Sequence, residues 1–147
     1  MVIMKLRHFF QKIQDDRLVS AIREAENKSS GEVRVFISRR AVGDPVAAAA
    51  ARFTRLGMEK TEARNGVLIF VAPRSQNFAI IGDLAVHEKC GTAFWESVTG
   101  EMASHFQKSQ FTEGILAGIR QAGNLLAHHF PRSASDKNEL PNEIDRD

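Results

Sequence analysis

Oxygen-bearing side chains stand beside the apolar segments of this sequence, at the points where strands would begin or end. Glu32 opens one such segment, Asn65 precedes a second, and Asp83 follows a third. Glu26 lies shortly before the first of them. Carboxylate and amide oxygens suit a hard cation such as Ca²⁺, which takes about six to eight oxygen ligands in a flexible geometry. The residue types therefore point to a divalent-cation site, provided that the fold brings them together.

Arg64 allows a different interpretation of the same carboxylates. Its guanidinium could pair with Glu32 or Asp83, and either carboxylate could instead cap the helix that follows it. Both interpretations need the same convergence in space. The residue types alone do not decide whether these carboxylates bind a metal ion or have only a structural role.

Most catalytic signatures are absent from the sequence. It contains no Gly-Lys-Ser/Thr phosphate loop, no Gly-x-Ser-x-Gly elbow and no His-Glu-x-x-His helix. Cys90 is the single cysteine, so an intrachain disulfide and a Cys-rich zinc site are excluded. We interpret it as a small residue near a helix start. No Ser–His or Cys–His pair is evident, which argues against nucleophilic catalysis.

Three segments have the composition of β-strands. Residues 32–38 are rich in β-branched and aromatic types, which predicts a strand. Residues 65–72 include a continuous apolar run, the pattern of a central strand covered on both faces. Residues 77–82 follow after a short turn, so we expect them to form an antiparallel hairpin with the second strand.

Helical segments separate and follow these strands. Asp44-Pro45 favours a helix start between the first two strands. Apolar residues at helical spacing predict a helix capped by Asp15 or Asp16, and two more helices after the third strand. The resulting order contains a βαβ unit, whose crossover is expected to be right-handed. We therefore predict an α/β fold: a three-layer α/β/α sandwich with a small mixed sheet, a βαβ unit plus a hairpin, and helices on both faces.

This topology positions the candidate ligands. The starts of the first two strands and the end of the third share one edge of the predicted sheet, and the helix before the first strand ends there too. We therefore expect Glu26, Glu32, Asn65 and Asp83 to lie near this edge.

Composition excludes several classes of protein. The chain has 147 residues, of which 43% are hydrophobic and 26% charged, as in an ordinary globular domain. A net charge of +2 is too small to indicate a nucleic-acid binder. No apolar run approaches the roughly 18–20 residues of a membrane span, and the amino-terminal residues do not resemble a secretory signal. We expect a cytoplasmic monomer.

The ends of the chain differ from its middle. We assign residues 1–131 to one domain, in which residues 1–14 form a helical extension. From residue 132 to residue 147 the apolar periodicity is lost and acidic residues prevail. This composition predicts a disordered acidic tail.

Several motifs resemble the TPM domain family, over about residues 15–131. They are Ser29-Ser30-Gly31-Glu32-Val33-Arg34-Val35, Arg64-Asn65-Gly66-Val67-Leu68-Ile69-Phe70-Val71-Ala72, Ala79-Ile80-Ile81-Gly82-Asp83, Phe94-Trp95, Glu113-Gly114-Ile115 and Phe130-Pro131. The resemblance implies an α/β/α sandwich and binding of a divalent metal, usually Ca²⁺, at an acidic site. Unlike many members, this chain lacks a signal peptide and a membrane helix, so it is similar to a short, soluble, bacterial-type member.

On matching positions the resemblance implies that Glu32 and Asp83 form the acidic pair, with Asn65 as a neighbour. Some members are reported as weak acid phosphatases. Two functions follow as hypotheses. The first is a Ca²⁺-binding interaction or regulatory module with a protein partner still to be identified. The second is a weak metal-dependent phosphomonoester hydrolase in which Asp83 acts as nucleophile or base.

Overall fold

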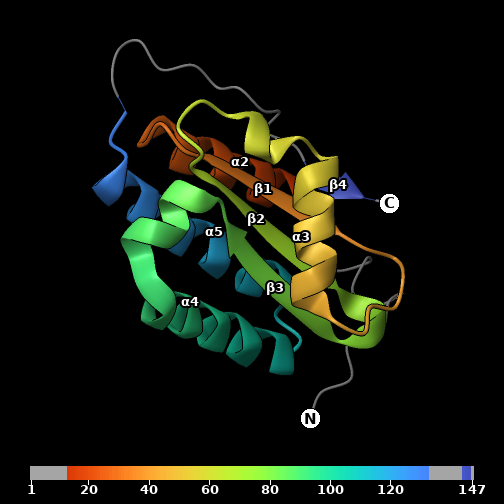
Figure 1. The fold of residues 1–147 in the computed structure, drawn as a ribbon. Coiled ribbons are helices and arrows are strands. Elements are labelled where there is room, and N and C mark those ends of the chain that lie inside the picture. Colours follow the sequence, from red (N-terminus) through yellow and green to blue (C-terminus); the bar gives the residue numbers. More distant parts are fainter. Residues whose placement is uncertain (1–12, 133–143, 147) are drawn as a thin grey trace.

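The computed structural model describes residues 13–132 and 144–146. Within these ranges the chain forms a four-stranded sheet in the order β3-β2-β1-β4 (Figure 1). The elements, in chain order, are α2 (Asp15–Asn27), β1 (Glu32–Ile37), α3 (Pro45–Arg55), η1 (Met58–Lys60), β2 (Gly66–Ala72), η2 (Pro73–Ser75), β3 (Asn77–Gly82), α4 (Leu84–Gln107), α5 (Phe111–His129) and β4 (Ile144–Arg146).

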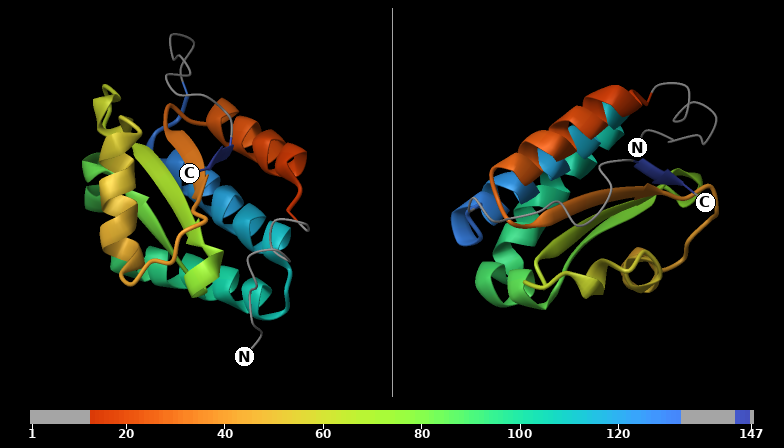
Figure 2. Two further views of the ribbon diagram at one scale, coloured as in Figure 1. Left: turned by 90° about the vertical axis from the view of Figure 1, so that its right-hand side faces the viewer. Right: turned by 90° about the horizontal axis from the view of Figure 1, so that it is seen from above.

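The elements form three layers. Helix α3 lies on one face of the sheet, and α2, α4 and α5 lie on the other, as the view from above in Figure 2 shows. The predicted α/β/α sandwich with a mixed sheet is therefore confirmed. No helix in residues 13–132 is long and apolar enough to cross a membrane.

The βαβ unit and the hairpin form as the residue pattern predicts. Strands β1 and β2 are parallel, with Glu32 opposite Gly66 and Ile37 opposite Val71. Strands β2 and β3 are antiparallel. The side chain of Asp44 accepts hydrogen bonds from the backbone N–H groups of Val46 and Ala47, both at 3.1 Å, and thereby caps α3.

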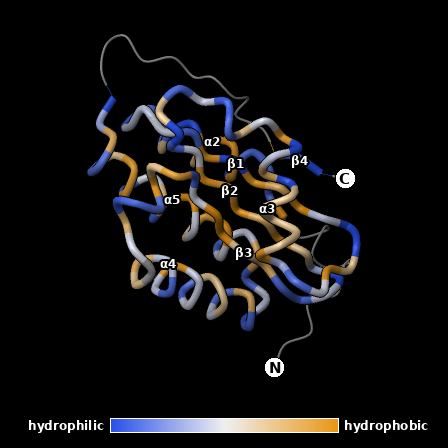
Figure 3. Tube along the Cα trace, in the orientation of Figure 1, coloured by the Kyte–Doolittle hydropathy of each residue, from blue (hydrophilic) through white to orange (hydrophobic). Residues whose placement is uncertain are grey.

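Each face of the sheet carries its own apolar core, because side chains alternate along a strand. In β2, Val67, Ile69 and Val71 face α2, α4 and α5, whereas Leu68 and Phe70 face α3. Every residue of β2 is buried. Figure 3 shows the hydrophobic colouring along the strands in the centre of the molecule. This two-sided burial explains the continuous apolar run in the sequence.

The helices differ in detail from the expected boundaries. The N-cap of α2 is Gln14, and Asp15 and Asp16 lie in the first turn, where negative charge complements the helix dipole. Helix α4 is kinked at Gly91, whose φ of 72° is non-helical. The helical extension predicted for residues 1–14 lies almost entirely outside the described residues.

Strand β4 corrects the prediction for the carboxyl-terminal segment. Residues Ile144–Arg146 were predicted to be disordered, but they form a strand that pairs in parallel with Val35–Ile37. The Arg34 guanidinium donates two hydrogen bonds to Asp145, at 2.5 and 3.0 Å, and Arg146 binds Asp15 at 2.6 Å. Ile144 packs against the core on the side of α2. Residues 133–143 and 147 lie outside the described residues.

The ion pair between Arg34 and Asp145 leads to a testable prediction. The Arg34 side chain is 9% exposed, so losing its carboxylate partner leaves a nearly buried cation without compensation. We expect Asp145→Asn to lower the free energy of unfolding by about 1.5–2 kcal/mol, at the lower end of the range for hydrogen bonds to charged groups, because Asn keeps one acceptor oxygen. Urea denaturation measures this difference. Glu101→Gln, at an exposed position of α4, is the control, and equal stability of the two variants would refute a role for β4 in the fold.

Candidate metal centre at the sheet edge

The predicted edge exists, and its backbone is tied together across three strands. Glu32 begins β1 directly opposite Gly66 at the start of β2. On the other side of β2, the Asp83 N–H donates to the carbonyl of Gly66 at 2.9 Å. Glu32 and Asp83 therefore flank Gly66, with their backbones about two strand spacings, or roughly 10 Å, apart.

The Asp83 carboxylate is almost completely buried, with 4% of the side chain exposed. It accepts hydrogen bonds from Arg64 Nε and Arg64 Nη2, both at 2.8 Å. It also accepts one from the backbone N–H of Leu84 at 2.7 Å, which caps α4. Asp83 thus pairs with Arg64 and caps the following helix, the structural role that the residues had left open.

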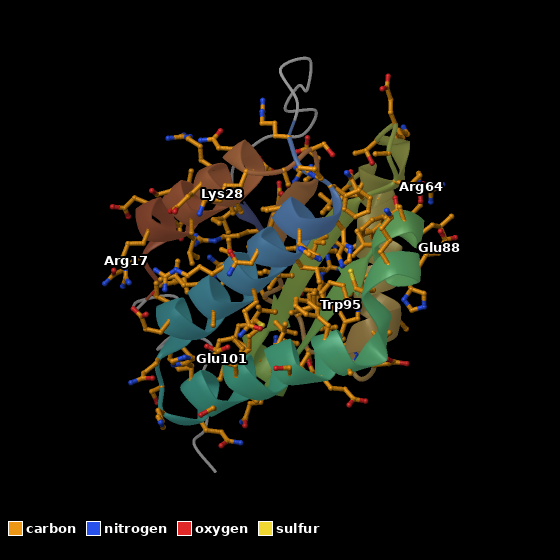
Figure 4. The ribbon with its side chains drawn as sticks, turned by 90° about the vertical axis from the view of Figure 1, so that its left-hand side faces the viewer. Arg17, Lys28, Arg64, Glu88, Trp95 and Glu101 are labelled. Carbon is orange, nitrogen blue, oxygen red and sulfur yellow. The ribbon has the colours of Figure 1, made fainter. Side chains whose placement is uncertain are left out.

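Arg64 reaches Asp83 because of an unusual backbone. Its φ of 51° lies in the left-handed region, and its carbonyl accepts a hydrogen bond from Ala85 N–H at 3.1 Å. The hydrogen bonds to Asp83 raise the pKa of the Arg64 guanidinium above its ordinary value. The Arg64 side chain remains 42% exposed, at the end of the molecule where Glu88 of α4 also lies (Figure 4). One partner of this ion pair is therefore buried and the other reaches solvent.

The remaining candidate ligands divide between the two faces of the sheet. Glu32 is buried and shares the α3 face with Gly66, since paired residues of neighbouring strands lie on one face. Asn65 is buried and donates from Nδ2 to Ser30 Oγ at 3.1 Å. Glu26, at the end of α2, is buried and accepts a hydrogen bond from Val33 N–H at 2.9 Å. Asn65 and Glu26 thus anchor the turn between α2 and β1, on the α5 side.

The donor chemistry fits a hard cation, because the edge offers buried carboxylate and amide oxygens. The hydrogen bonds of Asp83, however, restrict how a cation could bind there. Both Asp83 oxygens accept hydrogen bonds from Arg64, so a cation there has to compete with the guanidinium. Within residues 13–132 and 144–146, no three acidic, His or Cys side chains form a group that could hold a metal ion. A cation at this edge would therefore also need other oxygens.

The bidentate contact of Arg64 is the feature that sequence reasoning left undecided. A non-glycine residue with positive φ has no local sequence signal, although the charge of Arg64 directly before Asn65 did suggest a partner for Asp83. Cys90 was interpreted as a small residue near a helix start, and it lies within α4, directly before the kink at Gly91. It is half-buried, and burial raises the pKa of its thiol, which opposes formation of the reactive thiolate.

Comparison with known proteins covers most of the chain. The TPM domain matches residues 3–125. The NMR structure of the BA42 protein from the psychrophilic bacterium Bizionia argentinensis superimposes with a TM-score of 0.85 and 34% sequence identity. The match covers 92% of this chain and 96% of the other. No curated protein sequence matches. The fold, the motifs and this match together show that the chain belongs to the TPM domain family.

Proposed function

We propose that this protein is a Ca²⁺-binding interaction or regulatory module in which the cation competes with Arg64 for Asp83. The observation that carries the proposal is the asymmetry of this ion pair. A carboxylate with 4% exposure is neutralised by a side chain with 42% exposure. The buried partner is fixed by the N-cap bond to Leu84, whereas the exposed partner can rotate into solvent.

The neighbouring residues supply the rest of the argument. Asp83 and Glu32 flank Gly66 at one edge, and two carboxylates at one site favour a divalent cation, because it offsets their mutual repulsion. Bound there, Ca²⁺ would supply two positive charges and bind oxygens, with Asp83 and Glu32 as its proposed ligands. Family membership supports the proposal, because the resemblance implies an acidic metal site at these positions.

Displacement of Arg64 from Asp83 is the step by which Ca²⁺ binding changes the charge of the protein surface. A guanidinium released from Asp83 adds a free positive charge to the surface near Glu88, and the charge pattern of this end changes. Such a change alters which protein surfaces can dock, because charge complementarity selects partners and suppresses others. We propose that the partner is a protein that distinguishes the two states.

A Ca²⁺ titration of thermal stability tests this proposal with two variants. Arg64→Gln removes the competitor, so we expect a lower melting temperature without Ca²⁺ but a response that begins at a lower Ca²⁺ concentration than in the wild type. Asp83→Asn removes a charge while keeping a good N-cap residue, so we expect a lower melting temperature by a few degrees and no Ca²⁺ response.

Arg74→Gln is the matched control, because Arg74 is an exposed arginine away from this edge. It should respond to Ca²⁺ as the wild type does. If the ion pair is only structural, Arg64→Gln and Asp83→Asn both lower the melting temperature and Ca²⁺ changes none of the proteins. That outcome would refute the proposed site.

The phosphohydrolase alternative is tested with the same variants. While Arg64 binds both oxygens of Asp83, its positive charge lowers the basicity and the nucleophilicity of the carboxylate. Hydrolysis of p-nitrophenyl phosphate should therefore be negligible without Ca²⁺. Saturable turnover in the wild type that disappears in Asp83→Asn would favour the enzyme over the binding module.

A further inference from the structure

A groove lies on the α3 face of the sheet, beside the end of β1, and no part of the proposed metal centre lines it. Arg40, which follows β1, and Arg52 and Arg55 of α3 stand around it. Phe70 of β2 and Val42 contribute apolar surface. The groove has a volume of about 220 Å³. This volume is smaller than the 300–1,000 Å³ or so of a drug-sized pocket and suits a ligand of one or two rings.

All charged residues that line this groove are positively charged. None of the residues that line it is acidic. Arg40, Arg52 and Arg55 make no ion pair with any residue that the structure describes. Three guanidinium groups around one depression repel each other and raise the local concentration of anions. The groove is therefore electrostatically suited to a negatively charged ligand.

Arg52 is held in place by an aromatic contact. The centre of its guanidinium lies 4.1 Å from the centroid of the Phe36 ring, a cation–π geometry. Stacking on a buried ring limits the motion of the guanidinium and leaves its edge free for hydrogen bonds. A planar fork of N–H donors matches a carboxylate in bidentate fashion.

The helix dipole does not account for the whole arrangement. Arg52 and Arg55 lie in the last turn of α3, where positive charge is favourable for that reason alone. Arg40, however, comes from a different segment, and the apolar surface from Phe70 and Val42 has no part in a dipole effect. The groove also lies where β1 ends, and in α/β sheets ligands bind outside the carboxyl ends of the strands.

We propose that this groove binds a small aromatic anion, a flat ring system that carries a carboxylate. The carboxylate pairs with Arg52 and Arg55, Arg40 adds positive charge, and the ring lies on the apolar surface of Phe70 and Val42. The proposal does not depend on Ca²⁺, because the Asp83 edge lies at the starts of β1 and β2, and binding is measured without the metal.

The test uses 1-naphthoate as the probe and amide NMR of the full chain as the readout. Two further probes separate charge from ring: acetate carries the carboxylate without the ring, and 1-naphthylmethanol carries the ring without the charge. We expect saturable shifts for 1-naphthoate at amides of residues 38–42 and 48–55. We expect each of the other two probes to bind at least about tenfold more weakly, because each lacks one of the two contacts.

Variants then test the arginines. Arg55→Gln and Arg52→Gln should each weaken 1-naphthoate binding by about tenfold, as expected for loss of a charged hydrogen-bonding partner. Arg55→Lys, which keeps the charge, should recover part of the affinity, and the exposed Arg74→Gln should match the wild type. Arg55 is exposed, so its variants should keep the fold, which the melting temperature checks. Non-saturating shifts, equal affinities of all variants, or tighter binding of acetate than of 1-naphthoate would overturn the proposal.

Discussion

Replacing Ile69 with Asp is expected to leave the protein unfolded. Ile69 lies in β2, the strand between β1 and β3, and its side chain is 0% exposed. It belongs to the apolar core that α2, α4 and α5 cover. An unpaired carboxylate at such a position costs several kcal/mol or more, and the total stability of a domain is only about 5–15 kcal/mol. The substitution therefore removes most or all of the stability.

Circular dichroism and amide NMR measure the outcome. Ile69→Val is the conservative comparison, with an expected loss of about 0.5–1.5 kcal/mol. Val46→Asp controls for the added charge, because Val46 is 63% exposed on α3 and should tolerate it. A folded, soluble Ile69→Asp protein would show that the three-layer arrangement is wrong.

Gly123→Val is expected to produce the next largest loss, at the contact between α2 and α5. A Cβ atom at Gly123 would lie 2.6 Å from the Cβ of Ala25 and 3.2 Å from its Cα. The nearer atom is a short side chain fixed to the backbone of α2, so the helices have to move apart. Overpacking typically costs about 1–3 kcal/mol, and a β-branched side chain at this contact places the expected loss near the upper limit.

Two comparisons make this prediction specific. Gly100→Ala in α4 should instead increase stability by about 0.5–1 kcal/mol, since nothing lies within 4 Å of its added Cβ and alanine favours the helix. Gly123→Ala combined with Ala25→Gly should be more stable than the sum of the two single changes predicts, because one substitution makes room for the other. If the two single changes in the free energy of unfolding, measured by urea denaturation, add up to that of the double variant, close packing of α2 against α5 is contradicted.

Much of the fold could be predicted because its elements have local patterns. The apolar run of β2 follows from burial on both faces, and Asp44-Pro45 marks the start of α3 through a side-chain cap that the structure confirms. The short turn before β3 requires an antiparallel pair. From these elements the convergence of Glu32 and Asp83 at one edge followed by topology alone.

The features that could not be predicted depend on distant partners. Strand β4 is only three residues long and sits in an acidic segment, and its pairing depends on Arg34, which lies 111 positions away from Asp145. The role of Arg64 depends on a positive φ angle, and the sequence contains no signal for a positive φ at a non-glycine residue. The division of the candidate ligands between two faces likewise depends on exact register, because one residue of slip reverses every side chain.

Strand β4 has a consequence for how the chain folds during synthesis. The ribosome releases β1 long before it releases its neighbour β4, because Arg34 and Asp145, whose side chains pair across this edge, lie 111 positions apart. Until then the outer edge of an apolar strand exposes backbone hydrogen-bonding groups, and such an edge can pair with other chains. We expect truncation before Ile144 to increase aggregation of the nascent or refolding protein more than it reduces the stability of the folded protein.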